Sequence, residues 1–325
     1  MPTIASTTKQ RQLAGGKLFF DLFNAAGQKT GERYLGATPG FTVAIKSDKI
    51  QSYAAENGIR ELDDETITSI TRTGKITVRQ ISLENLALFF AAQSSVQAQL
   101  AGAVTGEDVW VLPDRFYQLG ATVANPSGVR NVTSVTVTAS AAIAAWQSSH
   151  AYALGAHVKP AATPLYAYQA ITAGTSGASA PTWPTTVGDV VTDGGVSWVC
   201  IGILAPVLDT DYTVDTARAR VYTLPDARVS SQYPMPWALG YTKTAASRDQ
   251  LKTGGLTSNS GALRFEAHNI KGNNRDLYGA NVLLAPSGDI VFKDDSPKYG
   301  ELSFEISFSD GLNGEPALII DGQAV

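Results

Sequence analysis

Residues 67–92 read ITSITRTGKITVRQISLENLALFFAA, and this stretch joins a strand pattern directly to a helix pattern. Its first part is rich in Thr, Ile and Val, which fit a half-buried pleated surface. From Gly74 onward apolar and polar residues alternate, which predicts a strand with one buried face and one polar face. The apolar positions are Ile76 and Val78, and the polar positions are Lys75, Thr77 and Arg79.

At Ser82 the hydrophobic period changes from that of a strand to that of a helix. Apolar residues fall at the i, i+3, i+4 and i+7 positions, namely Leu83, Leu86, Ala87 and Phe90. Ser82 is suited to cap the helix, and Glu84 lies in its first turn beside the positive end. Because this apolar face is too small to be stable alone, we expect the helix to cover a sheet.

Most of the remaining chain also predicts strands. Strand patterns cover residues 18–23, 41–46, 132–139, 166–172, 196–201, 263–268 and 302–308. The turn at 286–289, between apolar runs 282–285 and 290–292, is typical of a hairpin. Residues 56–65 predict a charged loop and residues 94–107 a linker. Residues 1–17 predict an arm that is mobile or is ordered only by a neighbouring subunit. Ile67 and Ile70 are out of phase, which implies a bulge.

The composition favours a β-rich protein with many turns. Charged residues make up 17%, there are 30 glycines, and the formal net charge is -4, so tight binding of duplex phosphates is not expected. Cys200 is the only cysteine, which excludes an intrachain disulfide and a multi-cysteine zinc site. No signal peptide or bilayer-spanning apolar run is evident, so we expect a soluble protein of a reducing compartment.

The composition shifts between Trp146 and Gly202, where three of the five tryptophans occur among few charges. Because the earlier style of sequence resumes near Asp209, we expect a small all-β domain at 146–203. It would be inserted into a larger discontinuous domain of residues 1–145 and 204–325.

Several runs resemble the major tail tube proteins of long-tailed bacteriophages. These runs are GERYLGATPGF at 31–41, GIRELDD at 58–64, ISLENLALFF at 81–90, TDYTVD at 210–215, GALRF at 261–265 and NNRD at 273–276. The resemblance covers most of residues 30–145 and 205–310. It implies a β-sandwich or barrel with a flanking helix, assembled into stacked hexameric rings around a lumen that passes DNA. The insert more weakly resembles surface-decoration or carbohydrate-binding modules.

The same resemblance implies partners and a location. The chain would bind copies of itself, a tape measure protein and tail-tip or terminator proteins, in a virion tail made in the host cytoplasm. Phage DNA would pass through the lumen. The long chain and the insert favour a non-contractile tail.

The polar face of the strands supplies candidates for lining such a lumen. They are Lys75, Thr77, Arg79, Arg264, Glu266, Ser303, Glu305 and Ser307. Mixed charges and hydroxyls would let phosphates slide without being trapped. The alternative is an ordinary solvated sheet face.

The aromatic residues of the insert have two interpretations. They could stack on sugars of cell-surface glycans, or they could form the core of a small module that lacks disulfides. The stacking candidates are Trp146, Tyr152, Tyr166, Trp183 and Trp198. We expect no metal at His150 and His157, and we expect Cys200 to be a small buried hydrophobe.

No pattern typical of an enzyme occurs. The sequence lacks a nucleophile elbow, a phosphate-binding loop and a zinc-protease motif, and it predicts neither catalytic residues nor a cofactor. The leading hypothesis is therefore a structural virion protein, the repeating subunit of a tail tube. The alternative is a glycan-binding adhesion protein that acts through its insert.

Overall fold

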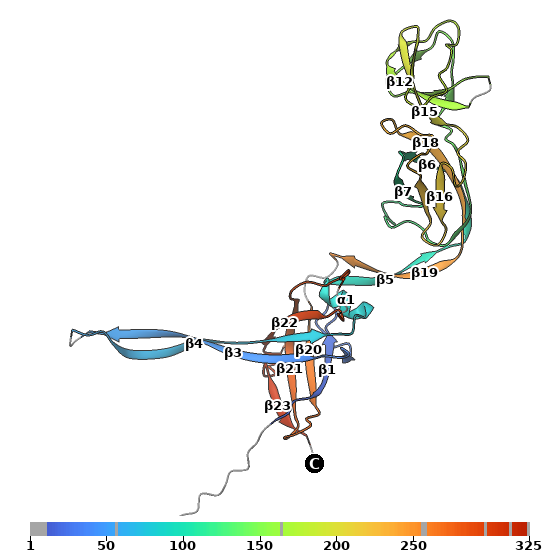
Figure 1. Ribbon diagram of the computed structural model, residues 1–325. Helices are drawn as coiled ribbons and strands as arrows, with labels where there is room; N and C mark the ends of the chain where they lie inside the picture. Colours follow the sequence, from blue (N-terminus) through green and yellow to red (C-terminus); the bar gives the residue numbers. More distant parts are fainter. Residues whose placement is uncertain are drawn as a thin grey trace, which may run out of the picture. The chain divides into compact units, whose positions relative to one another are not determined.

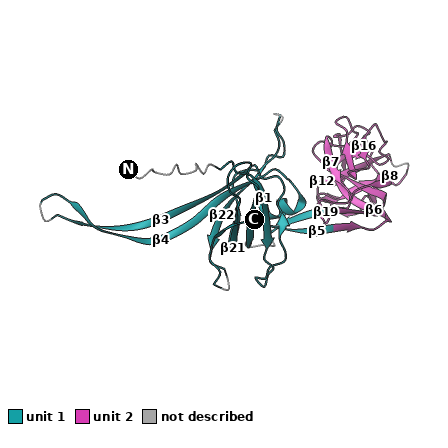
Figure 2. Ribbon diagram, turned by 90° about the horizontal axis from the view of Figure 1, so that it is seen from below, with its two compact units in different colours: residues 1–96, 249–325 teal, residues 97–248 magenta. Residues whose placement is uncertain are grey.

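The computed structural model describes residues 12–55, 58–162, 165–254, 259–295, 298–311 and 314–323. The chain forms two compact units, residues 1–96 with 249–325 and residues 97–248 (Figure 2). Within the described residues the secondary structure is strand apart from one α-helix, so the expected mainly β fold with a flanking helix is confirmed. The described part of the chain contains no helix with the length and apolarity needed to span a membrane.

The first unit is built on one sheet in the order β2-β1-β20-β21-β22-β4-β3, with β23 paired to β21. The strands are β1 (Gly16–Leu22), β2 (Arg33–Tyr34), β3 (Gly40–Ala54), β4 (Glu61–Val78), β20 (Ser260–Ala267), β21 (Arg275–Pro286), β22 (Leu302–Ser309) and β23 (Ile319–Gly322). One face of this sheet carries the core. Its largest buried side chains include Leu18, Phe20, Ile76 and Phe304.

Helix α1 (Leu83–Phe89) packs against β21 and β22 on the core face, as expected for a helix that covers a sheet. Ser82 is its N-cap and accepts a hydrogen bond from the Asn85 amide at 3.2 Å. The prediction that Leu83, Leu86, Ala87 and Phe90 form the buried face is wrong in detail. The buried helix residues are Asn85, Leu88 and Phe89. The helix is only seven residues long, so contacts with the sheet, not its own period, decide which side is buried.

Asn85 explains why a polar residue lies in this interface. Its amide donates to the carbonyl oxygens of Leu35 and Gln80 at 2.9 and 2.8 Å and accepts from Arg33 at 2.9 Å. The partly buried Arg33 guanidinium has a lowered pKa because burial disfavours its charge. Asn85 therefore ties α1 to two segments that precede it, residues 33–35 and Gln80.

Two strands, β5 (Ala92–Gln99) and β19 (Ala246–Thr253), pair with each other, and both unit boundaries fall within them. The expected linker at 94–107 is therefore wrong, since it forms most of β5 and the start of β6. The expected loop at 56–65 is also wrong in part, because β4 begins at Glu61. Residues 290–292 form no strand, and β21 pairs with β22 instead. Of the expected arm, residues 1–11 lie outside the described residues.

The second unit contains two three-stranded sheets around one core. The first has the order β6-β18-β8 and the second β16-β17-β7. Their bounds are β6 (Gly102–Val111), β7 (Arg115–Gln118), β8 (Val132–Ala139), β16 (Tyr212–Asp215), β17 (Arg220–Thr223) and β18 (Met235–Lys243). Trp237, Leu239 and Val221 are fully buried between them.

The expected insert forms a five-stranded sheet, β14-β15-β12-β11-β9, and a small pair, β10 and β13 (Figure 1). The bounds are β9 (Ala144–Ala145), β10 (Ala151–Tyr152), β11 (His157–Lys159), β12 (Tyr166–Thr172), β13 (Gly174–Thr175), β14 (Val190–Asp193) and β15 (Val196–Ile203). One side of this sheet carries its own aromatic core, with Tyr168 and Trp198. The other side, with Ala167, Val199 and Ile201, belongs to the core of the surrounding sheets.

The unit boundaries therefore differ from the expected domains. The division falls at 96/97 and 248/249, and residues 146–203 lie inside the second unit. The physical reason is that β12 and β15 are buried on both faces, so the insert shares a core with the residues around it.

Candidate functional site

The polar face of the first unit's sheet gathers the eight residues predicted from the alternating pattern. Directly paired residues share a face of a sheet, and Lys75 pairs with Glu305 while Thr77 pairs with Ser303. The same face continues across β21 to β20. Ser307 pairs with Leu283 on β21, and Leu283 pairs with Ser260 on β20. Alternation from Ser260 then places Arg264 and Glu266 on the same face, opposite the core residues Leu263 and Phe265.

Most charges on this face are paired. Lys75 Nζ lies 3.8 Å from Glu305 Oε1, and both side chains are more than half exposed. Arg79 Nε lies 2.8 Å from Glu301 Oε1, and Arg264 Nε lies 2.8 Å from Glu32 Oε1. Exposed pairs of this kind contribute little to stability, so their main effect is a face of mixed and nearly balanced charge.

Sequence reasoning missed two members of this face. Glu301 lies two residues before Ser303 and could have been found by extending the alternation by one step. Glu32 lies outside the strands and gave no signal. Arg264 also lies over the ring of Tyr278, 5.0 Å from its centroid, which restricts this guanidinium further.

A groove of about 440 Å³ runs along the middle of the polar face. Its walls are mainly small side chains and the paired charges, including Ala44, Thr73, Ala285 and Ser307. Leu283, 40% exposed, also lines the groove. Among the described residues of this unit no sheet or helix covers the polar face, because α1 lies on the core side.

The most unusual feature of the first unit is the ribbon formed by β3 and β4 (Figure 1). The strands are 15 and 18 residues long, and the ribbon projects beyond the other strands of the sheet. Large apolar side chains along it are exposed, with Ile45 at 65%, Ile67 at 54% and Ile70 at 51%. A two-stranded ribbon is at best marginally stable in water when nothing covers it.

The exposed apolar residues of the ribbon form one stripe. Ile45 pairs with Arg72, Ile70 with Ser47, Ile67 with Lys49 and Tyr53 with Leu62. Counting along β3, these pairs continue the side on which Phe41 and Val43 pack into the core. Ile50, 66% exposed, pairs with Thr66 on the opposite side.

The stripe depends on the predicted bulge. The register shifts between Asp48 and Lys49, where β4 has an extra residue, Thr68. The shift brings Ile67 back to the same side as Ile70, although the two are three residues apart. A second register shift follows between Ser52 and Tyr53, and it places Leu62 on the same side of the ribbon as Ile67. The bulges therefore keep these apolar side chains on one side of the ribbon, where polar partners lie beside them and the Gln51–Glu65 pair interrupts them.

The aromatic residues of the insert form its core. Trp198 is fully buried, so its assignment as a glycan-stacking residue is wrong. Trp146, Tyr152, Tyr166 and Trp183 are half-buried and pack against that core. Tyr152 and Trp183 both contact the Trp198 ring, with centroids 4.9 and 6.0 Å away. For a small sheet with no disulfide, these rings supply the buried area that other cores obtain from aliphatic residues.

Asp193 organises this core. Its buried carboxylate accepts hydrogen bonds from the indole nitrogens of Trp146 and Trp198, at 2.8 and 3.1 Å, and from the amide of Gly177 at 2.8 Å. No local pattern predicts that Asp193 accepts these hydrogen bonds, because it is separated from Trp146 by 47 residues.

Cys200 is a buried free thiol, as predicted, and burial raises its pKa to about 11. Burial lowers the pKa of His157, whose ring lies 5.1 Å from that of Trp110. Within the described residues no three His, Cys, Asp or Glu side chains are grouped to hold a metal ion.

The model of one protein family matches residues 13–161 of the chain, and the family is described as "Protein of unknown function UCP028589". This match spans less than half of the 325 residues. No curated protein matches the chain.

Proposed function

We propose that this protein is a structural virion protein, the repeating subunit of a phage tail tube that forms stacked hexameric rings around a DNA-conducting lumen. The action of such a subunit is assembly. The observation that carries the proposal is the apolar stripe of the β3–β4 ribbon, which the described residues of its own unit leave uncovered.

The stripe favours a second copy of the chain as its partner. It is the outward continuation of the core face, and the described residues of its own unit supply no side chains that bury it, so we assign the covering side chains to a second copy. The sheet also ends in β3, which has no partner on its outer edge in the described part of the chain. An open, long edge strand is a natural site for pairing with another chain, and a repeated contact of this kind builds rings or stacks.

The properties of the polar face support the proposal that it lines the lumen. It is uncovered, its charges are of both signs and largely paired, and its centre is lined by small residues. Such a surface offers no concentrated positive charge to trap a phosphate backbone. The proposed lining residues are the eight that share this face, together with Glu301.

The remaining partners follow from the same proposal. A tape measure protein would occupy the lumen before DNA, and terminator or tail-tip proteins would close the ends of the tube. Glycan binding through the insert is the alternative function, and no observation favours it, because the aromatic rings are used for packing.

The test is electron microscopy of the concentrated full-length protein, with its size measured in parallel by sedimentation velocity. Hollow tubes of stacked rings are the expected result. A chain that remains monomeric at the highest concentration, with and without a tail-tip complex added as an initiator, would contradict the proposal.

A further inference from the structure

Four arginines that are far apart in the sequence gather in the second unit. They are Arg130, Arg218, Arg220 and Arg248. Arg130 belongs to the loop 125–130, and Arg248 bonds to that loop. The Gln118 side chain also bonds to the loop, and it contacts Arg220 through the Nε of that arginine and Arg218 through its backbone carbonyl. We call this group the arginine cluster.

The loop holds the first two guanidinium groups. Arg130 Nη1 donates to the carbonyl oxygens of Ser127 and Val129 at 2.6 and 2.7 Å. Arg248 Nη2 donates to the side-chain oxygens of Asn125 and Ser127, both at 3.0 Å, and to the carbonyl oxygen of Gly128 at 2.7 Å. Because both guanidinium groups bond to Ser127, they lie close together.

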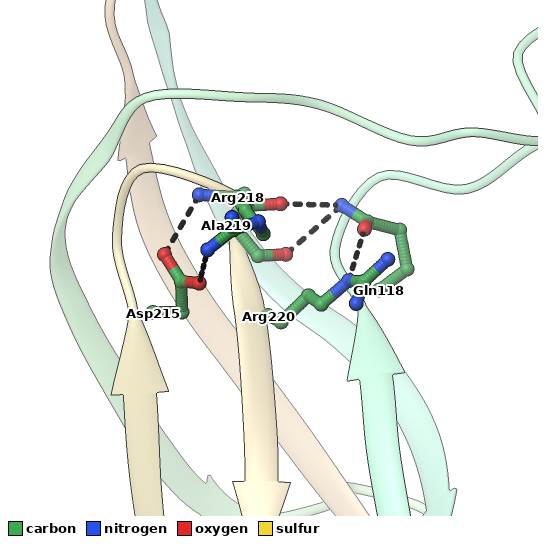
Figure 3. A network of polar contacts seen from close by, with 5 residues as sticks. All are labelled: Gln118, Asp215, Arg218, Ala219 and Arg220. Carbon is green, nitrogen blue, oxygen red and sulfur yellow. Dashed lines mark hydrogen bonds and ion pairs between the residues drawn. The ribbon is translucent and has the colours of Figure 1, made fainter. Parts of the chain in front are cut away.

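Gln118, at the end of β7, joins this pair to the other two arginines (Figure 3). Its Nε2 donates to the carbonyl oxygens of Val129, Arg218 and Ala219, each at 3.0 Å. Its Oε1 accepts from Arg220 Nε at 3.2 Å. The amide therefore fixes the start of β17 against the loop and orients the Arg220 side chain.

The cluster carries more positive than negative charge. Arg218 forms an ion pair with Asp215 at 3.1 Å, and in the described residues no carboxylate lies within 4.0 Å of the other three guanidinium groups. Burial, the larger cause, and the neighbouring Arg248, Arg220 and Arg218 lower the pKa of Arg130. Neutral carbonyl, amide and hydroxyl oxygens orient the side chains but do not neutralise them.

This arrangement is suited to an external anion. Arg220 and Arg218 are exposed, and Arg130 and Arg248 are half-buried. Toward the described residues, the Arg220 guanidinium donates one hydrogen bond, from one of its five N–H groups. Guanidinium groups held in fixed positions bind multiply charged oxyanions well, because each can donate two parallel hydrogen bonds and little side-chain freedom remains to be lost.

We propose that the arginine cluster is a binding site for phosphate groups, free or carried on a polymer. A phosphate group carries between one and two negative charges at neutral pH and three acceptor oxygens, which matches an excess of three positive charges better than a single carboxylate does. The site belongs to residues 97–248, whereas the assembly surfaces proposed above belong to the other unit. Either proposal can therefore fail without the other.

The experiment is isothermal titration calorimetry of the full-length protein with inorganic phosphate, polyphosphate and acetate at constant ionic strength. Saturable binding of phosphate, and weaker binding of acetate, is expected. The double variant R218Q/R220Q should weaken phosphate binding about ten-fold or more, since it removes two charge-assisted donors. Arg115→Gln is the matched control, because Arg115 is exposed on the neighbouring strand β7 and lies outside the cluster.

The polyphosphate titration distinguishes the two sources of the group. Tighter binding of the polymer at equal phosphate concentration assigns the site to polymer-borne phosphate, and equal binding assigns it to the free ion. The proposal is overturned if phosphate binding is not saturable, if acetate binds equally, or if R115Q weakens binding as much as R218Q/R220Q. Should the double variant lose its native circular dichroism, Arg220→Gln alone provides the same comparison, because its side chain is exposed.

Discussion

Replacing three isoleucines of the ribbon stripe should weaken self-association without unfolding the subunit. The triple variant I45T/I67T/I70T keeps β-branched side chains, so strand propensity is preserved. In the isolated chain these residues are between 51% and 65% exposed, so we expect the free energy of unfolding to change little. What the variant removes is the apolar area that a second copy would bury.

The magnitude follows from that area. Fully burying an isoleucine contributes about 1.5 to 3 kcal/mol, and here about half of each side chain remains to be covered. Threonine retains one methyl group, so each substitution should cost about 0.5 to 1 kcal/mol at the contact. The three together should cost about 1.5 to 3 kcal/mol, which lowers the association constant between two subunits roughly 10- to 150-fold.

The assay is the critical concentration for tube formation, measured by sedimentation and checked by electron microscopy. The matched control is Ile50→Thr compared with Ile70→Thr, because both residues are exposed on the same ribbon but on opposite sides. Ile70→Thr should raise the critical concentration, and Ile50→Thr should leave it near that of the wild type. Equal effects of the two variants, or normal assembly of the triple variant, would refute the reasoning.

Three further predictions concern stability. Asn85→Ala should lower the free energy of unfolding by about 2 to 4 kcal/mol, because it leaves buried polar partners unpaired; denaturant unfolding measures this, and a loss below about 1 kcal/mol would contradict it. Asp193→Ala should shift tryptophan fluorescence to longer wavelength as two indoles lose their acceptor, and an unchanged spectrum would argue against that role. Burial opposes ionisation of Asp211, but hydrogen bonds from Arg228 and the backbone outweigh it and lower its pKa. The stability from this pair should therefore be complete above the unfolded pKa of about 4 and be lost as pH falls through the lower folded pKa. Asp211→Asn should flatten this acid limb in thermal melts, and a limb of unchanged steepness would count against the assignment.

Local patterns in the sequence predicted much of the first unit. The alternation after Gly74 identified β4 and its polar face, and the same period identified β22, because adjacent side chains of a strand point to opposite faces whatever the strand packs against. Ser82 was identified as a helix cap for an equally local reason, since its hydroxyl bonds an amide three residues away. The phase break at Ile67 and Ile70 correctly indicated a bulge.

Tertiary structure decided the features that depend on distant partners. The pattern around Trp198 could not distinguish a core ring from a binding ring, because its burial is set by distant residues. These are Tyr152 and Asp193 on other strands and Trp183 in a loop. The insert could be delimited by composition, but its shared core could not, since Ile201 is buried by residues outside the insert.

The two surfaces on which the proposals rest also depend on tertiary structure, although their residues can be read in the sequence. Ile45, Ile67 and Ile70 are visible in the sequence, yet only the register of β3 with β4 aligns these three on one side of the ribbon and leaves Ile50 on the other. The arginine cluster joins residues from four separate segments through a loop and one glutamine. Sequence periodicity determines which way a side chain points within its own strand, whereas only the folded chain determines which charges and apolar groups become neighbours.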